Sequence, residues 1–338
     1  MADSRSLTSR VDASPVGGTP VGGTPIGGTP VGGTPGDGGV AEGVTLKLAI
    51  DRASVDRELE RLCAGPALEA LPAPVANAIR YSILGQGKRL RPILMLAAYR
   101  ACGGEQDASA LAACIEVVHA YSLVHDDLPC MDDDDMRRGR PTTHRVHGVA
   151  IATAAGVVMV PLAVRAACDA GVQLGLPNAS QAAIVRELMR ASGGGGMVGG
   201  QLLDLEGEGS SLSIDQLERI HGAKTGALIS ASARIGGIAA GASAAGLDAL
   251  TAYGDAIGLA FQITDDVLDA TSTTAALGKT AGRDVELRKS TYPMLLGVER
   301  AVARADSLVD DACAALERAG LRTATLEMLA RYAIARTS

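Results

Sequence analysis

The apolar positions of this chain follow a helical pattern over most of its length. From about Val44 onward they recur three and four residues apart, the spacing of one face of an α-helix, and no run alternates as a half-buried strand does. Glycine clusters at 102–104 and 193–196 interrupt the pattern. Helices are predicted over 54–64, 75–83, 92–101, 108–124, 149–170, 180–191, 214–240 and 244–270, with more beyond Thr291. The predicted fold class is all-α, a single-domain bundle of about ten or more helices.

The first 44 residues differ from the rest of the chain. Residues 16–35 are four copies of a five-residue unit, three reading VGGTP and one reading IGGTP. Such a segment buries too little apolar surface to offset the entropy of ordering it, so residues 1–44 are expected to be a disordered tail and residues 45–338 the folded domain. The N-terminus has no apolar h-region, which argues against a secretory signal, and Asp3 and Asp12 argue against a transit peptide.

The most apolar run is VAIATAAGVVMVPLAV, residues 149–164, which carries no charged residue. It is short for a bilayer span and contains Pro161. We therefore expect a buried core helix and no membrane span.

Composition narrows the classes of partner. The 338 residues carry a net charge of −7 with no stripe of Lys and Arg interleaved with aromatic residues, so nucleic acid is not expected as a partner. The six cysteines form no CxxC pair, which argues against a disulfide framework or a zinc site and favours a reducing, cytoplasmic setting. With one Phe and no Trp, the core must be packed with Ala, Leu, Val and Ile. Ala and Leu are strong helix formers, which supports the all-α prediction.

The stretch DDLPCMDDDD, residues 126–135, places six aspartates at the end of a predicted helix that is apolar almost all round. Such a cluster is costly unless a cation is held there. Asp126 and Asp132 are six residues apart and would point to different sides of a straight helix. Pro129 lies between them, and two looped-out residues there would bring Asp132 onto the face of Asp126. For residues 133–135, an exposed charge run is an equally good interpretation.

A second acidic cluster, FQITDDVLD at 261–269, places Asp265 and Asp269 four residues apart and therefore on one helix face. Carboxylates gathered in this way suit Mg²⁺, which takes oxygen ligands and usually keeps several waters and a substrate phosphate. A calcium-binding surface loop is the competing interpretation of either cluster.

Basic residues accompany both acidic clusters. GQGKRLRP, residues 85–92, offers Lys88, Arg89 and Arg91 after a glycine-rich turn and ahead of a predicted helix start, a combination typical of an anion site. The other candidate cations are Arg137 and Arg138 after the aspartates, Lys224 beside Thr225, Lys279 and Lys289. Together they indicate two diphosphate sites, one bridged by metal and one held by Arg and Lys alone.

Five motifs resemble the trans-isoprenyl diphosphate synthases, the head-to-tail prenyltransferases that include farnesyl and geranylgeranyl diphosphate synthases. They are GQGKRLRP, HAYSLVHDDLPCMDDDDMRRG, GMVGGQLLDLE, HGAKTGALI and GLAFQITDDVLDATSTTAALGKTAGRDVELRKSTYP. The resemblance runs from about Val44 to the C-terminus in the family's order and leaves out the GGTP-repeat tail. It implies the isoprenoid-synthase type of bundle, with helices around a central cavity, and a homodimer.

The resemblance also implies roles at the matching positions. The ligands of three Mg²⁺ ions would be Asp126, Asp132, Asp265 and Asp269. The catalytic set would be Asp126, Asp127, Asp132, Arg137, Lys224, Asp265 and Asp266. Isopentenyl diphosphate would be held by Lys88, Arg91, His119 and Arg138. The allylic diphosphate would be held by Arg137, Lys224, Thr225, Gln262, Lys279 and Lys289. Gln201 and Asp204 match a further family motif and would face the cavity.

Two side chains near the motifs, those of His119 and Phe261, have a structural interpretation as well as a functional one. His119 lies two turns before Asp126 on the same helix face, which favours ligand contact, although a lone histidine on an apolar helix is often only a core residue. Phe261 lies beside Gln262, where its ring would either stabilise a carbocation or simply pack.

The implied reaction is the Mg²⁺-dependent condensation of isopentenyl diphosphate with dimethylallyl or geranyl diphosphate. No buried general base accompanies the acidic motifs, so the departed diphosphate would take up the C2 proton. Tyr121 and Ser122 lie where the family sets product length. Tyr121, with the insertion around Pro129, resembles bacterial farnesyl diphosphate synthases and favours a C15 product. Cys130 and residues 278–293 resemble geranylgeranyl synthases equally well, so a C20 product is the alternative.

One departure from the family lies in the helix after the first motif. Val149 and Val157 follow glycines where the family usually has Gly-Glu and Gly-Asp pairs, which puts the usual packing of this helix in doubt.

Three competing functions explain less of the sequence. A class I terpene cyclase would share both acidic clusters but would not need a metal-free diphosphate site. A non-catalytic subunit would tend to lose aspartates that this chain keeps. A calcium-binding structural protein would not account for the Lys and Arg set.

Overall fold

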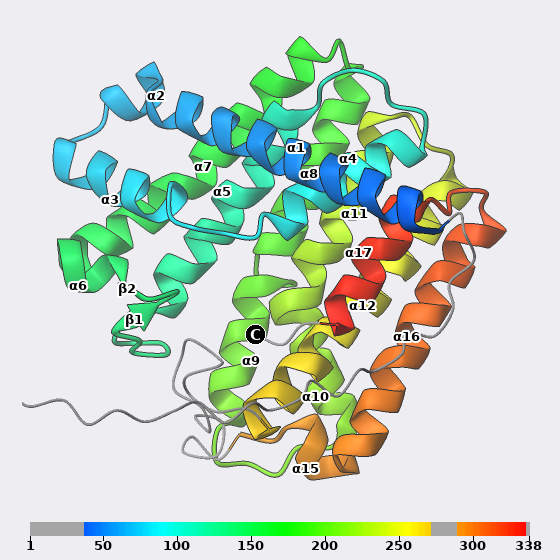
Figure 1. Ribbon diagram of the computed structural model, residues 1–338. Coiled ribbons are helices and arrows are strands. Elements are labelled where there is room, and N and C mark those ends of the chain that lie inside the picture. The colour runs from blue at the N-terminus through cyan, green and yellow to red at the C-terminus, as the bar shows by residue number, and fades with distance from the viewer. Residues whose placement is uncertain (1–36, 272–288, 336–338) are drawn as a thin grey trace, which may run out of the picture. The chain divides into compact units, whose positions relative to one another are not determined.

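Helices make up most of the described residues, 37–271 and 289–335, of this computed structural model (Figure 1). They are α1 (Asp37–Cys63), α2 (Pro66–Glu69), α3 (Ala73–Ile83), α4 (Leu90–Ala101), α5 (Ser109–Asp126), α6 (Thr143–His147), α7 (Val149–Gln173), α8 (Asn178–Ser192), α9 (Met197–Gly207), α10 (Ile214–His221), η1 (Gly222–Gly226), α11 (Ala227–Ala239), α12 (Ala244–Thr271), α15 (Tyr292–Leu296), α16 (Val298–Arg318) and α17 (Ala324–Ile334). A short antiparallel hairpin pairs β1 (Met136–Arg137) with β2 (Arg140–Pro141). The all-α prediction is confirmed.

Several element boundaries differ from the predicted ones. The first predicted helix, over 54–64, begins at Asp37 in α1, inside the residues assigned to the tail; residues 1–36 of that tail lie outside the described residues. The helix α9 was not predicted, because its Gly199 and Gly200 are poor helix formers. The predicted helix over 214–240 is instead α10 and α11 joined by η1, a single turn of π-helix.

Two helices, α4 and α11, connect two hydrophobic cores within the unit formed by residues 39–338. One core includes side chains of α3, α5, α7 and α8, and the other includes side chains of α12, α16 and α17. Met95 of α4 belongs to the first core and Leu94 to the second. Gly236 of α11 permits the close approach, since a Cβ there would lie 2.4 Å from the Met95 carbonyl oxygen. The helix α4 is thereby held closely against α11.

The apolar helix α7 packs along α5 and also contacts α3, α6 and α8. By length and composition alone it would be able to cross a membrane, yet it contributes Ala152, Ala155, Met159 and Ala163 to the first core. The two valines at family-acidic positions, Val149 and Val157, are 47% and 60% exposed. They therefore leave the packing of α7 on α5 intact.

Candidate active site

The acidic segment after α5 folds back onto the helix end. The backbone N–H of Asp132 donates to the carbonyl of Asp126, the last residue of α5, at 2.8 Å. In an α-helix this bond reaches four residues back, so a bond reaching six residues back means that two extra residues are looped out. The predicted bulge within a continuing helix is wrong, because α5 ends at Asp126, but the turns that follow do bring the Asp132 backbone back to the end of the helix. Asp133 turns the chain in the left-handed conformation at φ 50°, and its side chain is exposed.

The carboxylates of this segment are buried to different degrees and interact with one another. Asp127 is buried and accepts a hydrogen bond from Arg137 Nε at 2.6 Å. Burial raises the pKa of Asp126 to about 6; Lys224 opposes the rise and Asp132 adds to it. Because ionising Asp126 is costly in this setting, a bound cation would stabilise the ionised cluster.

The second acidic cluster lies near the C-terminal end of α12. Asp265 Oδ2 accepts a hydrogen bond from Gln262 Nε2 at 3.2 Å, and Gln262 Oε1 accepts one from Thr225 Oγ1 at 3.1 Å. Asp266 is bound elsewhere, because its Oδ2 accepts from the Tyr292 N–H at 2.9 Å and lies 3.2 Å from His221 Nε2. Asp266 thus ties α12 to α10 and α15. Asp269 is also buried.

Both acidic clusters border the residues of η1. Lys224 of η1 opposes the rise in the pKa of Asp126, and the adjacent Thr225 begins the hydrogen-bonded series that ends at Asp265. Two glycines let η1 approach the helices on either side. A Cβ on Gly200 of α9 would lie 2.2 Å from Lys224 N, and one on Gly258 of α12 would lie 2.7 Å from Gly226 Cα. A π-helical turn of this kind is often found at functional sites.

A separate group of cations surrounds the start of α4. Arg91 Nη1 lies 3.5 Å from His119 Nε2, and Arg91 Nε is buried without a hydrogen-bond partner. Arg138 Nη1 donates to the Gln86 carbonyl at 2.8 Å, and Lys88 in the same loop is exposed. Burial, with Arg91 and Arg138, holds the pKa of His119 well below its usual range, so its imidazole is neutral. A buried guanidinium donor without an acceptor suits an anionic ligand.

Arg89 is used differently from its two basic neighbours in the loop. It is buried in the left-handed conformation at φ 52°. Its guanidinium donates to Glu116 Oε1 at 2.7 Å, to Asp56 Oδ1 at 2.8 Å and to the Gly85 carbonyl at 2.9 Å. Arg89 therefore anchors the loop to α1 and α5. Sequence reasoning missed Glu116, whose only signal is a single acidic residue within an apolar helix.

The helix α9 presents Gln201 and Asp204 to the site. Gln201 Nε2 donates to Asp132 Oδ1 at 3.0 Å, while Gln201 Oε1 is buried without a partner. Asp204 Oδ2 accepts from Lys224 Nζ at 2.6 Å and from Lys289 Nζ at 2.9 Å. Lys279, the remaining predicted cation, lies outside the described residues.

The donor set fits Mg²⁺. Gln201 Oε1 is a buried acceptor beside Asp132 that a metal-bound water would satisfy. Within 37–271 and 289–335, no three His, Cys, Asp or Glu side chains are close enough together to hold an ion by themselves. Mg²⁺ usually binds through one or two carboxylates together with waters and substrate phosphates, and each acidic cluster offers such carboxylates.

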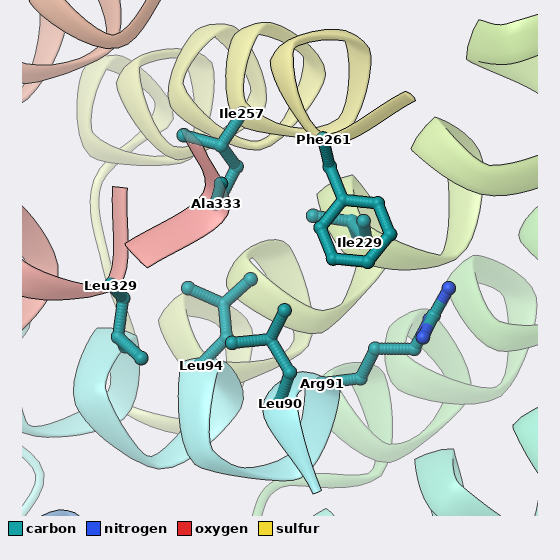
Figure 2. A pocket seen from close by; sticks show the side chains of 8 residues that line it. All are labelled: Leu90, Arg91, Leu94, Ile229, Ile257, Phe261, Leu329 and Ala333. Carbon is teal, nitrogen blue, oxygen red and sulfur yellow. The ribbon is translucent and has the colours of Figure 1, made fainter. Parts of the chain in front are cut away.

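A pocket beside Arg91 is otherwise apolar (Figure 2). Its lining comes from α4, α11, α12 and α17 and consists of Leu90, Arg91, Leu94, Ile229, Ile257, Phe261, Leu329 and Ala333. Figure 2 shows the Phe261 ring projecting from α12 into this pocket.

The two residues predicted to set product length are buried on α5. The Tyr121 ring meets the His125 ring edge-on, with centroids 4.9 Å apart. His125 in turn covers Gly156 of α7, where a Cβ would lie 2.1 Å from His125 Nε2. Ser122 Oγ donates to the His119 carbonyl at 2.8 Å. Tyr121 is thus packed against His125, which in turn contacts α7.

Comparison with known proteins identifies the family. The sequence model of the Polyprenyl synthetase family matches residues 72–321. The chain is 47% identical over 271 residues to farnesyl diphosphate synthase of Escherichia coli, an alignment covering 78% of this chain and 89% of that protein. This chain belongs to the polyprenyl synthetase family. It is a prenyltransferase of the trans-isoprenyl diphosphate synthase group, as its motifs predicted.

Other relatives of this family member differ in the product that their names state. Geranylgeranyl pyrophosphate synthase 7 of Arabidopsis thaliana is 43% identical over 249 residues, covering 71% of this chain and 70% of that protein. Among solved structures, an FPP/GFPP synthase from Zymomonas mobilis matches with a TM-score of 0.74 and 34% identity, over 86% of this chain and 99% of that one. Geranylgeranyl pyrophosphate synthetase from Pyrococcus horikoshii matches with a TM-score of 0.77 and 30% identity, over 88% and 99%.

Proposed function

We propose that this prenyltransferase condenses isopentenyl diphosphate with dimethylallyl and geranyl diphosphates to form farnesyl diphosphate. One observation carries the proposal. Thr225 of η1 is hydrogen-bonded to Gln262, which in turn donates to Asp265, and the neighbouring Lys224 acts on Asp126; Arg91 lies beside His119 at the start of α4, with Arg138 near them. An allylic diphosphate bridged to carboxylates by metal suits the first group, and isopentenyl diphosphate suits the second.

We infer that Asp126, Asp132, Asp265 and Asp269 hold the metal in this chain, with three Mg²⁺ ions as the expected number. Bound Mg²⁺ would supply Lewis-acid stabilisation of the diphosphate leaving group. Asp127 would act through Arg137, to which it is bound, and Asp266 would hold α12 in place through Tyr292. Both were predicted to be catalytic, and their contacts support an indirect contribution.

The remaining polar residues would bind and orient the two substrates. Isopentenyl diphosphate would be held by Lys88, Arg91, His119 and Arg138. The allylic diphosphate would contact a second set of cations and polar groups, which are Arg137, Lys224, Thr225, Gln262, Lys279 and Lys289. Breaking of the allylic C1–O bond would leave an allylic carbocation and free diphosphate, and C4 of an aligned isopentenyl diphosphate would then form the new carbon–carbon bond to the allylic C1. The cation left at C3 would lose a proton from C2 to the departed diphosphate, which restores a double bond.

The proposed product is C15, with C20 as the alternative. Tyr121 packs against the His125 ring and lies five residues before Asp126, so its ring would limit how far a growing chain extends beyond the acidic cluster. The relatives include both farnesyl and geranylgeranyl synthases, which keeps the longer product open.

We also infer a cytoplasmic homodimer in which the catalytic domain comprises residues 45–338 together with the part of α1 that precedes them, residues 37–44. The support for the dimer is an exposed stripe along α7. Val149, Thr153, Val157 and Pro161 follow one another at four-residue spacing and are all exposed. Such an uncharged helix face is typical of a subunit interface.

The experiment that tests the function is incubation of the purified chain with isopentenyl diphosphate and, in separate reactions, dimethylallyl, geranyl or farnesyl diphosphate. Products are identified by mass spectrometry after removal of the diphosphate. We expect farnesyl products with Mg²⁺ and none with excess EDTA. Conversion of geranyl diphosphate to a cyclic hydrocarbon without consumption of isopentenyl diphosphate would contradict the proposal.

A further inference from the structure

One carboxylate oxygen gathers two lysines that come from distant parts of the chain. Asp204 Oδ2 lies 2.6 Å from Lys224 Nζ of η1 and 2.9 Å from Lys289 Nζ, ahead of α15. The Lys289 ammonium also lies 3.4 Å from Glu208 Oε1. Burial alone would raise the pKa of Asp204, but Lys224 and Lys289 hold it below its ordinary value, so the carboxylate is ionised. Two ammonium groups that would otherwise repel one another are therefore held together.

The arrangement leaves both lysines able to bind a further anion. An ammonium group has three N–H donors and no acceptor. The bond to Asp204 occupies one donor of each lysine, while the flexible four-carbon stem is already fixed. Fixing the stem in advance lowers the entropy lost when a ligand binds.

The same helix also contacts the first acidic cluster. Gln201 lies one turn before Asp204 on α9, and its amide donates to Asp132 Oδ1 at 3.0 Å. One turn of α9 thus contacts an expected metal ligand through Gln201 and two ammonium groups through Asp204.

We propose that Asp204 is a positioning residue that presents Lys224 and Lys289 together to the diphosphate of the allylic substrate. The inference rests on the proposed function, since it deepens the description of the same site. Asp204 acts through the two lysines and does not touch the reacting carbons. Its carboxylate sets the spacing of the two ammonium groups, which a diphosphate then spans.

The test uses Asp204→Asn in the full chain, with Asp204→Glu as the charge-conserving variant and Glu206→Gln as the matched control. Glu206 is an exposed acidic residue on the same helix, two positions away. Two quantities are measured: the Kd of inorganic diphosphate with Mg²⁺ present, by calorimetry, and the KM values of geranyl and isopentenyl diphosphate. The calorimetric measurement does not require turnover, so it reports on Asp204 even if the proposed reaction is wrong.

For Asp204→Asn we expect the Kd of diphosphate and the KM of geranyl diphosphate to rise about 10- to 100-fold, as is typical when a group that orients a ligand is removed. The KM of isopentenyl diphosphate and the melting temperature should be unchanged. Asp204→Glu should lose less affinity for diphosphate than Asp204→Asn, and Glu206→Gln should lose none. The proposal is overturned if Asp204→Asn binds diphosphate as tightly as the wild type. It is equally overturned if both KM values rise together as the melting temperature falls, since that marks a purely structural role.

Discussion

Residues that share one motif have separate tasks in this enzyme, and GQGKRLRP illustrates the division best. The sequence places three cations within four positions but does not say which of them is exposed. Arg89 is buried by Glu116 and Asp56, whose carboxylates lie on other helices, while Lys88 is left exposed. These partners are 27 and 33 residues away, so local patterns cannot predict the pairing. The sequence therefore predicts which residues could bind a substrate diphosphate, but not the residues that hold the loop in place.

The neutral imidazole of His119 makes stability depend on pH. Histidine in an unfolded chain titrates near pH 6.5, whereas the pKa of His119 in the folded chain lies well below that value. As the pH falls through about 6.5 the unfolded state therefore binds more protons than the folded state, and the free energy of unfolding decreases by up to about 1.4 kcal/mol per pH unit. The stability that comes from keeping His119 neutral is fully present only at pH values above the pKa of histidine in the unfolded chain.

His119→Gln should remove that part of the pH dependence, because glutamine does not titrate. The measurement is urea unfolding of both proteins without substrates at several pH values between 7 and 5.5. The wild type should lose more stability than His119→Gln on acidification. Equal losses in the two proteins would mean that His119 has the same pKa in the folded chain as in the unfolded chain.

Tyr121 provides the residue-scale prediction about product length. Tyr121→Ala removes the ring that packs on His125, so the space below the acidic cluster deepens and products longer than those of the wild type should appear. The change should also cost roughly 3 kcal/mol of stability, as large-to-small core substitutions do. Chromatography of the products from geranyl diphosphate and isopentenyl diphosphate measures the length. Tyr121→Phe keeps the ring and is the control, with an unchanged product. If Tyr121→Ala released only wild-type lengths, the floor of the cavity would lie elsewhere.

At the scale of elements, the site is built where helices approach more closely than side chains normally allow. The sequence predicts α5, α7 and α12 because their apolar patterns are long and continuous. It does not predict α9, since Gly199 and Gly200 weaken the helical pattern. The structure supplies the reason for Gly200, which lies against the backbone of Lys224 in η1. Nor does periodicity reveal that one turn between α10 and α11 is π-helical, since the apolar pattern continues through it.

Gly258 tests the importance of this close approach. Gly258→Ala would place a methyl group 2.7 Å from Gly226 Cα, and neither backbone is free to move. We expect η1 to shift away from α12, with a stability loss of roughly 1–3 kcal/mol from overpacking and a lower affinity for diphosphate. Denaturant unfolding measures the loss of stability, and calorimetry measures the affinity for diphosphate.

Gly246→Ala in the same helix is the matched control. Its Cβ would meet no atom closer than 3.5 Å, so the substitution should stabilise the chain by up to about 1 kcal/mol. Similar effects of the two substitutions on stability and on diphosphate affinity would show that neither property requires the close approach of η1 to α12.

At the scale of the whole molecule, the fold class followed from the sequence while the arrangement of helices did not. Ala-rich helices that are apolar nearly all round do not indicate which face meets which neighbour. The central position of α4 and α11, shared by two cores, depends on Gly236, whose meaning appears only when its contact with Met95 is known. Family resemblance supplied what the periodicity lacked, because it joined five motifs far apart in sequence into one site.

The exposed stripe on α7 leads to the last prediction. Val157 is 60% exposed within a row of uncharged residues, where a folded monomer gains nothing from a valine, and it stands where the family usually has an acidic residue. If two chains associate through this stripe, Val157→Lys would bury an unpaired charge in each subunit. The cost would be at least about 3 kcal/mol, or roughly a hundredfold in the dissociation constant. Sedimentation velocity should then show the wild type as a dimer and Val157→Lys shifted toward monomer, while Val302→Lys, at an exposed valine of α16, remains dimeric. A wild type that sediments as a monomer, or a Val157→Lys variant that associates as tightly as the wild type, would remove α7 as the interface.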